Sequence, residues 1–132
     1  MYGMRGAAAY GRVSVESDVF SASPHKLISL LFDGAQKNIR AAQLHIEQGN
    51  IAEKGKAITK AIDIVQQGLL AALDKEVGGE MADNLEAIYL YVSELLLKAN
   101  LHNDVNKLAE AAHLLNEIGS AWKSIQPQAE EV

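Results

Sequence analysis

The fold is decided by residues 23–49, SPHKLISLLFDGAQKNIRAAQLHIEQG, which read as one complete amphipathic helix with its own start and end. Ser23 can accept a hydrogen bond from a free N–H group of the first turn, and Pro24 at the first helical position loses no bond. Gly49 can take the left-handed conformation that closes a helix. Apolar residues between these ends recur at steps of four and three, and therefore share one face. They are Ile28, Phe32, Ala35, Ile39, Ala42 and Ile46. The sequence predicts a helix over 24–48 with one core-facing stripe.

Three further amphipathic segments follow, each separated from the next by a short turn. Asn50 with Glu53 forms a capping-box-like pair at the start of the second segment. Gly78 and Gly79 interrupt the pattern after it, and Asn103 is a candidate cap for the last helix. The predicted ranges are about 51–77, 81–101 and 104–125. Helices joined by such short turns run antiparallel, so we expect an all-α fold, an antiparallel up-down four-helix bundle.

The same spacing predicts which residues of the later helices face the core. In the second helix they are Ile58, Ile62, Val65, Leu69 and Ala72; in the third, Met81, Leu85, Ile88, Val92, Leu95 and Ala99; in the fourth, Val105, Leu108, Ala112, Leu115, Gly119 and Trp122.

The two ends of the chain differ from this bundle, which we place at 23–126. Residues 1–22 contain several glycines and serines and predict a partly flexible N-terminal arm, with at most a short extra helix. Tyr10 and Val13 are among the apolar residues that make this arm more than a simple tail. Residues 127–132 predict a frayed tail.

Length and charge limit the class of protein. A chain of 132 residues fits one domain, and its net charge of −5, with scattered basic residues, argues against nucleic acid as a partner. There is no apolar run of about 18 residues for a membrane span and no secretory signal, and the chain has no cysteine. We therefore expect a cytosolic protein that does not insert into a membrane.

Beside its core series, the second helix carries another series of mostly small residues. It comprises Ala57, Ala61, Ile64, Gly68 and Ala71. Together the two series span an apolar arc of about 200°, wider than one packing face of a small bundle requires. Because small side chains let another backbone approach closely, we interpret this second series as the floor of a groove.

The third helix has outer leucines roughly opposite its core stripe: Leu90, Leu97 and Leu101. Single surface leucines are ordinary, but three on one face favour a contact surface. In the first helix, Leu27 lies on the flank of the core stripe, where it either packs at the core edge or meets a partner.

Three polar residues lie beside the core stripe of the third helix: Asn84, Tyr89 and Tyr91. They either make structural hydrogen bonds at the edge of the core or bind the backbone of an extended partner.

Patterns typical of catalysis or of metal binding are incomplete. Glu110 and His113 have the spacing of a di-iron ligand pair, but no other histidine has a glutamate three residues before it. No phosphate-binding loop and no nucleophile with an orienting partner is present. We therefore expect neither an enzyme nor a cofactor or metal, and leave open the role of the acidic residues between Asp74 and Glu86.

The chain resembles the flagellin-specific export chaperones of bacterial flagella, the FliS family. The resemblance runs through AYGRVSVESDVFSASPHKLISLLFDGA (9–35), KGKAITKAIDIVQQGLLAALDKE (54–76), NLEAIYLYVSELLLKANLHNDV (84–105) and EIGSAWK (117–123), and so covers nearly the whole chain. It implies a cytosolic chaperone whose client is the disordered C-terminal segment of flagellin. Such a chaperone prevents premature polymerisation and keeps the subunit competent for type III export, with the export gate as a further partner of the complex. The resemblance also implies that the arm takes part in client binding or covers the empty groove.

The candidate client-binding residues come from the small-residue series of the second helix, the outer leucines of the third helix, the flank of the first helix, the polar residues beside the third core stripe, and the arm. They are Tyr10, Val13, Leu27, Ala57, Ala61, Ile64, Gly68, Ala71, Asn84, Tyr89, Leu90, Tyr91, Leu97 and Leu101. The chief alternative is a homodimeric helical scaffold or adaptor whose outer leucines pair with a second copy, whereas the chaperone is expected to be a monomer or at most a weak dimer. An enzyme with an unrecognised site would need a polar cavity, against which the uninterrupted apolar stripes argue.

Overall fold

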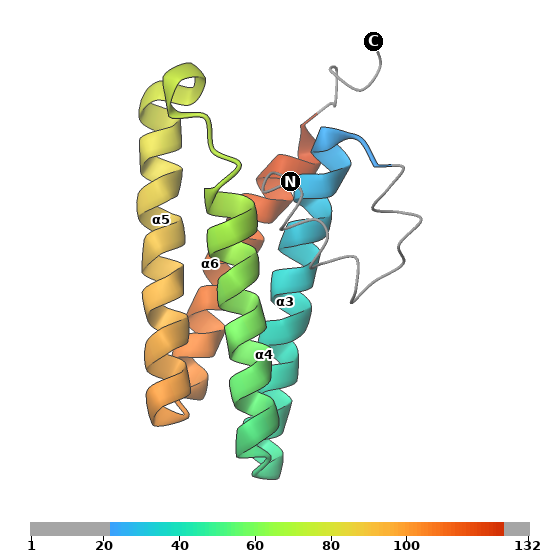
Figure 1. Ribbon diagram of the computed structural model, residues 1–132, viewed down its shortest axis with the longest axis vertical. Coiled ribbons are helices and arrows are strands. Elements are labelled where there is room, and N and C mark those ends of the chain that lie inside the picture. The colour runs from blue at the N-terminus through green and yellow to red at the C-terminus, as the bar shows by residue number, and fades with distance from the viewer. Residues whose placement is uncertain (1–21, 126–132) are drawn as a thin grey trace.

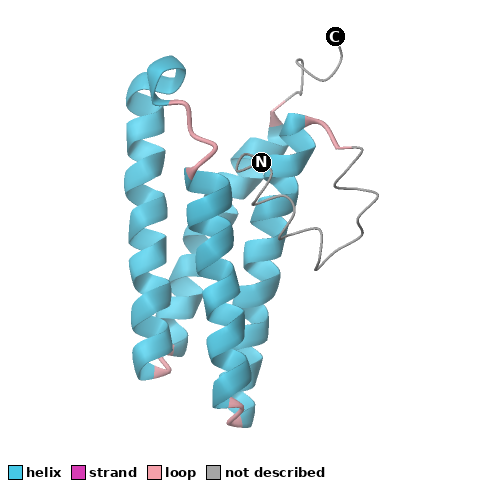
Figure 2. Ribbon diagram, in the orientation of Figure 1, coloured by secondary structure: helices cyan, strands magenta, loops and turns pink. Residues whose placement is uncertain are grey.

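The computed structural model of the protein describes residues 22–125, in which four helical rods stand side by side (Figure 1). The rods are α3 (Pro24–Gln48), α4 (Ile51–Asp63) with its π-helical continuation η2 (Ile64–Leu70), α5 (Lys75–His102) and α6 (Val105–Ser124). Short turns reverse the chain between them, and this part of the chain contains no strand (Figure 2). The predicted all-α antiparallel four-helix bundle is confirmed. Almost all of the predicted arm, with Tyr10 and Val13, and the predicted tail lie outside the described residues.

Each helix packs against two others, so that the four form a closed square. α3 contacts α4 and α6, and α5 contacts the same two helices from the other side. The α3–α4 and α5–α6 turns lie together at one end of the bundle, which we call the turn end (Figure 1). The start of α3 and the end of α6 lie at the opposite end.

The first helix begins and ends where the sequence predicts. The Ser23 hydroxyl accepts a hydrogen bond from the Lys26 N–H at 3.1 Å, and Pro24 occupies the first turn. Gly49 has a φ of 76°, and its N–H donates to the Ile46 carbonyl at 3.1 Å. This left-handed cap satisfies a carbonyl that the helix itself leaves free.

Two of the predicted caps are wrong. The Asn50 side chain makes no capping bond to α4, and its Nδ2 donates instead to Gln48 Oε1 at 3.2 Å. Asn103 does not cap α6 but closes α5 with a φ of 51°, a left-handed conformation that asparagine tolerates better than most residues. Asp104 caps α6, accepting from the backbone N–H groups of its second and third residues at 3.0 and 3.3 Å.

The boundary between the second and third rods also differs from the prediction. The helical part of the second rod ends at Leu70, earlier than residue 77, and α5 begins at Lys75, earlier than residue 81. Asp74 starts α5 because its carboxylate accepts from the Glu76 and Val77 N–H groups, each at 3.1 Å. The glycine interruption is real, but it is a kink inside α5, where Gly79 has a φ of 55° and a ψ of −128°.

The core contains most of the predicted stripes. Ile39, Ile58, Val92 and Leu115 are completely buried at its centre, each from a different rod. Three predicted core residues are exposed: Ala72, Met81 and Val105. Each stands at or near the end of its helix, so the periodicity continues there but neighbouring helices no longer cover it.

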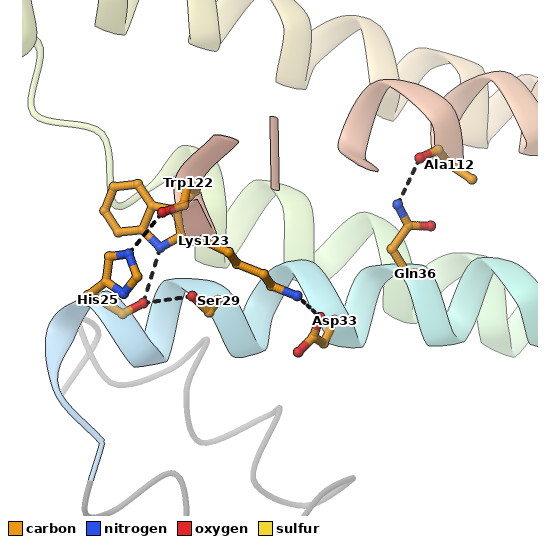
Figure 3. Close-up of polar contacts among 7 residues, drawn as sticks. All are labelled: His25, Ser29, Asp33, Gln36, Ala112, Trp122 and Lys123. Carbon is orange, nitrogen blue, oxygen red and sulfur yellow. Dashed lines mark hydrogen bonds and ion pairs between the residues drawn. The ribbon is translucent and has the colours of Figure 1, made fainter. Parts of the chain in front are cut away.

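A set of polar contacts fixes α6 against α3 at the end opposite the turns (Figure 3). His25 Nε2 donates to the Trp122 carbonyl at 2.9 Å, the Trp122 indole N–H donates to the His25 carbonyl at 3.1 Å, and the two rings stack at 4.7 Å. Lys123 forms an ion pair with Asp33 further along. These contacts hold the start of α3 and the end of α6 against each other.

Candidate binding surface

The outer leucines of α5 are exposed, as predicted. The exposed fractions are 49% for Leu90, 56% for Leu97 and 75% for Leu101. They lie on the face of α5 that points away from the core, since Val92 and Ala99 on the same helix are completely buried. We call Leu90, Leu97 and Leu101 the outer stripe. Within residues 22–125 the bundle core is closed without these side chains, which leaves them exposed for contact with another molecule.

Polar groups border the outer stripe on one side. Tyr91 is 44% exposed, and its hydroxyl donates to Glu110 Oε2 of α6 at 2.6 Å. This hydrogen bond raises the pKa of Tyr91, since it holds the proton on the phenol. Lys98 and Glu94 form an ion pair at 2.8 Å, and the hydrogen bond from the Lys98 ammonium lowers the pKa of the Glu94 carboxyl. An apolar strip with a polar rim is typical of protein-binding surfaces.

At the turn end the outer stripe runs into a hollow between the first turn of α4 and the last turn of α5. Its lining residues are Ile51, Lys54, Leu97, Asn100, Leu101 and Asn103. Lys54 is only 4% exposed, and its Nζ donates to the Asn100 carbonyl at 2.8 Å. We call this hollow the Lys54 pocket.

Ile51 and Lys54 were not among the predicted site residues. A signal for Lys54 was nevertheless present in the sequence, because it precedes Ile58 by four residues and so extends the core stripe of α4. A lysine at such a core position needs a partner, and here it finds one in the end of α5.

The interpretation of the small residues of α4 and η2 as the floor of a groove is wrong. Ala57, Ala61, Ile64 and Gly68 are buried within the bundle core. A Cβ added at Gly68 would lie 3.0 Å from both terminal methyl carbons of Leu31, so α3 itself occupies this side of the rod. Each helix of a square bundle packs on two neighbours, and the wide apolar arc of this rod packs against both of them.

Of the remaining predicted site residues in the described part of the chain, some are buried in the core and others are exposed. Leu27 packs against the core, and Tyr89 is 3% exposed with its ring centroid 6.5 Å from that of Phe32. Burial raises the pKa of Tyr89 to about 12. Ala71 and Asn84 are exposed. The structure thus brings Leu97 and Leu101 together at one pocket, and it places Leu27 and Tyr89 in structural positions.

The acidic residues at the start of α5 are partly neutralised within the helix. Lys75 Nζ lies 2.9 Å from Glu86 Oε1 and 3.8 Å from Asp83 Oδ1. The hydrogen bond to Glu86 raises the pKa of Lys75. These contacts connect the short turn before the Gly79 kink to the helix after it.

Residues 22–125 contain no group of three or more histidine, aspartate or glutamate side chains placed to hold a metal ion. None of the helices in this range combines the length and the apolar character needed to cross a membrane.

Comparison with known proteins identifies the family. The family model described as "Flagellar protein FliS" matches residues 6–129. The chain is 51% identical over 129 residues to the flagellar secretion chaperone FliS of Salmonella typhimurium strain LT2, covering 98% of this chain and 96% of that protein. It is 43% identical over 125 residues to the flagellar secretion chaperone FliSB of Pseudomonas aeruginosa, covering 95% of this chain and 98% of that protein. With the chaperone FliS of Bacillus subtilis strain 168 the identity is 32% over 108 residues, or 82% and 79% of the two chains. The chain therefore belongs to the FliS family.

Proposed function

We propose that this protein is a cytosolic flagellar secretion chaperone that binds the disordered C-terminal segment of flagellin. Binding would prevent premature polymerisation of flagellin and keep it competent for type III export, with the export gate as a partner of the complex. The names of the relatives support the chaperone part of this proposal. The observation that carries the client part is the outer stripe, an exposed apolar surface on a bundle whose core is already complete.

The energetics favour several anchors instead of one. Burying a whole leucine side chain contributes about 1.5–3 kcal/mol, and between half and three quarters of each stripe leucine is still exposed. Each leucine would thus contribute about 1 kcal/mol or slightly more. A disordered segment loses conformational entropy on binding, so it has to cover the stripe and the Lys54 pocket together to bind firmly.

The proposed activity needs no chemical step. The polar rim is hydrogen-bonded internally, Tyr91 to Glu110 and Lys98 to Glu94, so it can remain solvated beside a bound client and keep these bonds. Release then requires only a competing partner that lowers the fraction of bound client.

The experiment is a calorimetric titration of a peptide spanning the C-terminal region of flagellin. Replacing Leu90 and Leu97 together by Asp should weaken binding about a hundredfold, because two apolar contacts of about 1 kcal/mol each are lost and two charges must be desolvated. Leu44→Asp is the matched control, since Leu44 is 51% exposed but lies on α3. Equal affinity of the double variant and the control would remove the outer stripe from the site.

A homodimeric scaffold is the second candidate, because the same outer stripe could pair with a second copy. Sedimentation of the isolated protein separates the two functions. A monomer that binds one flagellin segment supports the chaperone, whereas a tight dimer that ignores the segment supports the scaffold.

A further inference from the structure

The Lys54 pocket combines a nearly buried cation with an exposed aliphatic rim. Ile51, Leu97 and Leu101 are 51%, 56% and 75% exposed, whereas Lys54 between them is 4% exposed. The rim is available to another molecule, and the ammonium group lies below it.

The hydrogen bonding of Lys54 is incomplete for a lysine so deeply placed. Among the described residues the Lys54 ammonium makes one hydrogen bond, to the Asn100 carbonyl, and an ammonium group has further donors to offer. Lysines are rarely this buried without a carboxylate partner, because desolvation of the charge is costly. Within residues 22–125, no ion pair includes Lys54, whereas the exposed Lys56, Lys75 and Lys98 each have a carboxylate partner.

The start of α4, which lies beside the pocket, also favours an anion. Lys54 already satisfies a carbonyl of the last turn of α5. The first turn of α4 has no side-chain cap, because the Asn50 amide is directed to Gln48. The positive end of the α4 dipole therefore lies beside Lys54, and the acidic residue of this first turn, Glu53, is paired with Lys56.

From this charge and this rim we propose that the Lys54 pocket binds a carboxylate side chain, Asp or Glu, set within an aliphatic stretch of the client segment. This inference rests on the proposed function and assigns a specific contact to it. The aliphatic neighbours would pack on Ile51, Leu97 and Leu101 and exclude water, which strengthens the pairing of the carboxylate with the Lys54 ammonium. A small inorganic anion would gain nothing from the three aliphatic side chains.

The position of the pocket favours a side-chain carboxylate over the end of a chain. Leu97 and Leu101 belong both to the pocket and to the outer stripe, which continues along α5 to Leu90. A segment that follows the stripe passes the pocket, so a side chain is the group that reaches Lys54.

The test is a double-mutant cycle measured by calorimetry with the flagellin C-terminal peptide. On the chaperone, Lys54→Met keeps the length and the apolar stem but removes the charge, and Lys56→Met is the matched control because Lys56 lies on the same helix with its side chain 77% exposed. On the peptide, each Asp or Glu is replaced in turn by Asn or Gln. We expect Lys54→Met to weaken binding about tenfold or more, Lys56→Met to have no effect, and one peptide replacement to abolish the difference between Lys54→Met and the original protein.

The outcomes separate this inference from the proposed function. If the original protein binds the peptide but neither Lys54→Met nor any peptide replacement weakens binding, the carboxylate contact is refuted while the chaperone function stands. If only amidation of the peptide's chain end weakens binding, the occupant is the chain end and the side-chain assignment is wrong. Failure of the original protein to bind the peptide refutes the proposed function itself. Because Lys54→Met also loses the bond to Asn100, thermal unfolding is recorded, and the peptide replacements against the original protein test the contact even if that variant unfolds.

Discussion

Replacing Gly119 by Ala should destabilise the bundle although the substitution favours helix formation. Gly119 is buried in α6, where it faces Phe32 of α3. An added Cβ would lie 3.1 Å from both Cγ and Cδ1 of the Phe32 ring and 3.3 Å from its Cβ. The optimal separation of two carbon atoms is about 3.5–4.0 Å, so either the ring or the helix has to move.

Two opposing terms decide the size of the effect. Phe32 is only 3% exposed and its Cβ is fixed to the backbone, so accommodating the new methyl group falls in the range of overpacked cores, about 1–3 kcal/mol. Exchanging Gly for Ala inside a helix returns about 1 kcal/mol. We therefore expect a net loss of about 1 kcal/mol in the free energy of unfolding.

Gly55→Ala is the matched control for this prediction. Gly55 lies inside α4, where a Cβ would meet only the Asn100 side-chain oxygen at 3.9 Å, an ordinary contact. This substitution should stabilise the protein by up to about 1 kcal/mol, so the two variants should differ by about 2 kcal/mol with opposite signs. Urea denaturation followed by circular dichroism measures both. A Gly119→Ala variant as stable as Gly55→Ala would refute the close packing of α6 on Phe32.

Two further predictions concern ionisation and capping. Burial raises the pKa of Tyr89 from 10.0 to about 12, so the unfolded chain loses the phenol proton at a lower pH than the folded protein does. Rising pH therefore favours the unfolded chain, and the stability contributed by the neutral, buried phenol is complete below pH 10 and is lost towards pH 12. Between these two pH values the original protein should lose about 2 kcal/mol more stability than Tyr89→Phe, as measured by urea denaturation at each pH, and equal losses would contradict the burial of the phenol. Asp104→Ala should cost about 1 kcal/mol because two N–H groups at the start of α6 lose their acceptor, whereas Asp104→Asn should cost little; thermal melting compares the two, and equal melting temperatures would contradict the cap.

The helices that carry complete signals of their own could be predicted from the sequence. For α3, Ser23, Pro24 and Gly49 act within one turn of the helix ends, and the structure uses all three as expected. The start of α5 could not be predicted in this way, because Gly78 and Gly79 suggest a boundary while Asp74 supplies a cap earlier in the chain. Local signals compete there, and packing against the rest of the bundle decides between them.

Periodicity also reaches its limit in the second rod. It assumes a regular α-helix, but residues Ile64–Leu70 form wider π-helical turns, in which Gly68 approaches Leu31 closely. Periodicity shows that two faces of this rod are apolar. It does not show that α3 and the other neighbouring helices cover both of these faces.

The candidate site was predictable where exposure follows from one helix alone. Leu90, Leu97 and Leu101 could be assigned to the outer face because they lie opposite the α5 core stripe. Tyr89 and the Lys54 pocket depend on which helix stands next to α5, so their burial and their contacts required the assembled bundle.

NMR of leucine methyl groups can show whether the outer stripe of α5 binds the C-terminal segment of flagellin. The flagellin segment is added to protein labelled at the leucine methyls. We expect changes in the signals of Leu90, Leu97 and Leu101, with intermolecular contacts to the segment, while the signal of exposed Leu44 on α3 stays unchanged. Binding that leaves the three stripe leucines unperturbed, or perturbs Leu44 in their place, would contradict this expectation.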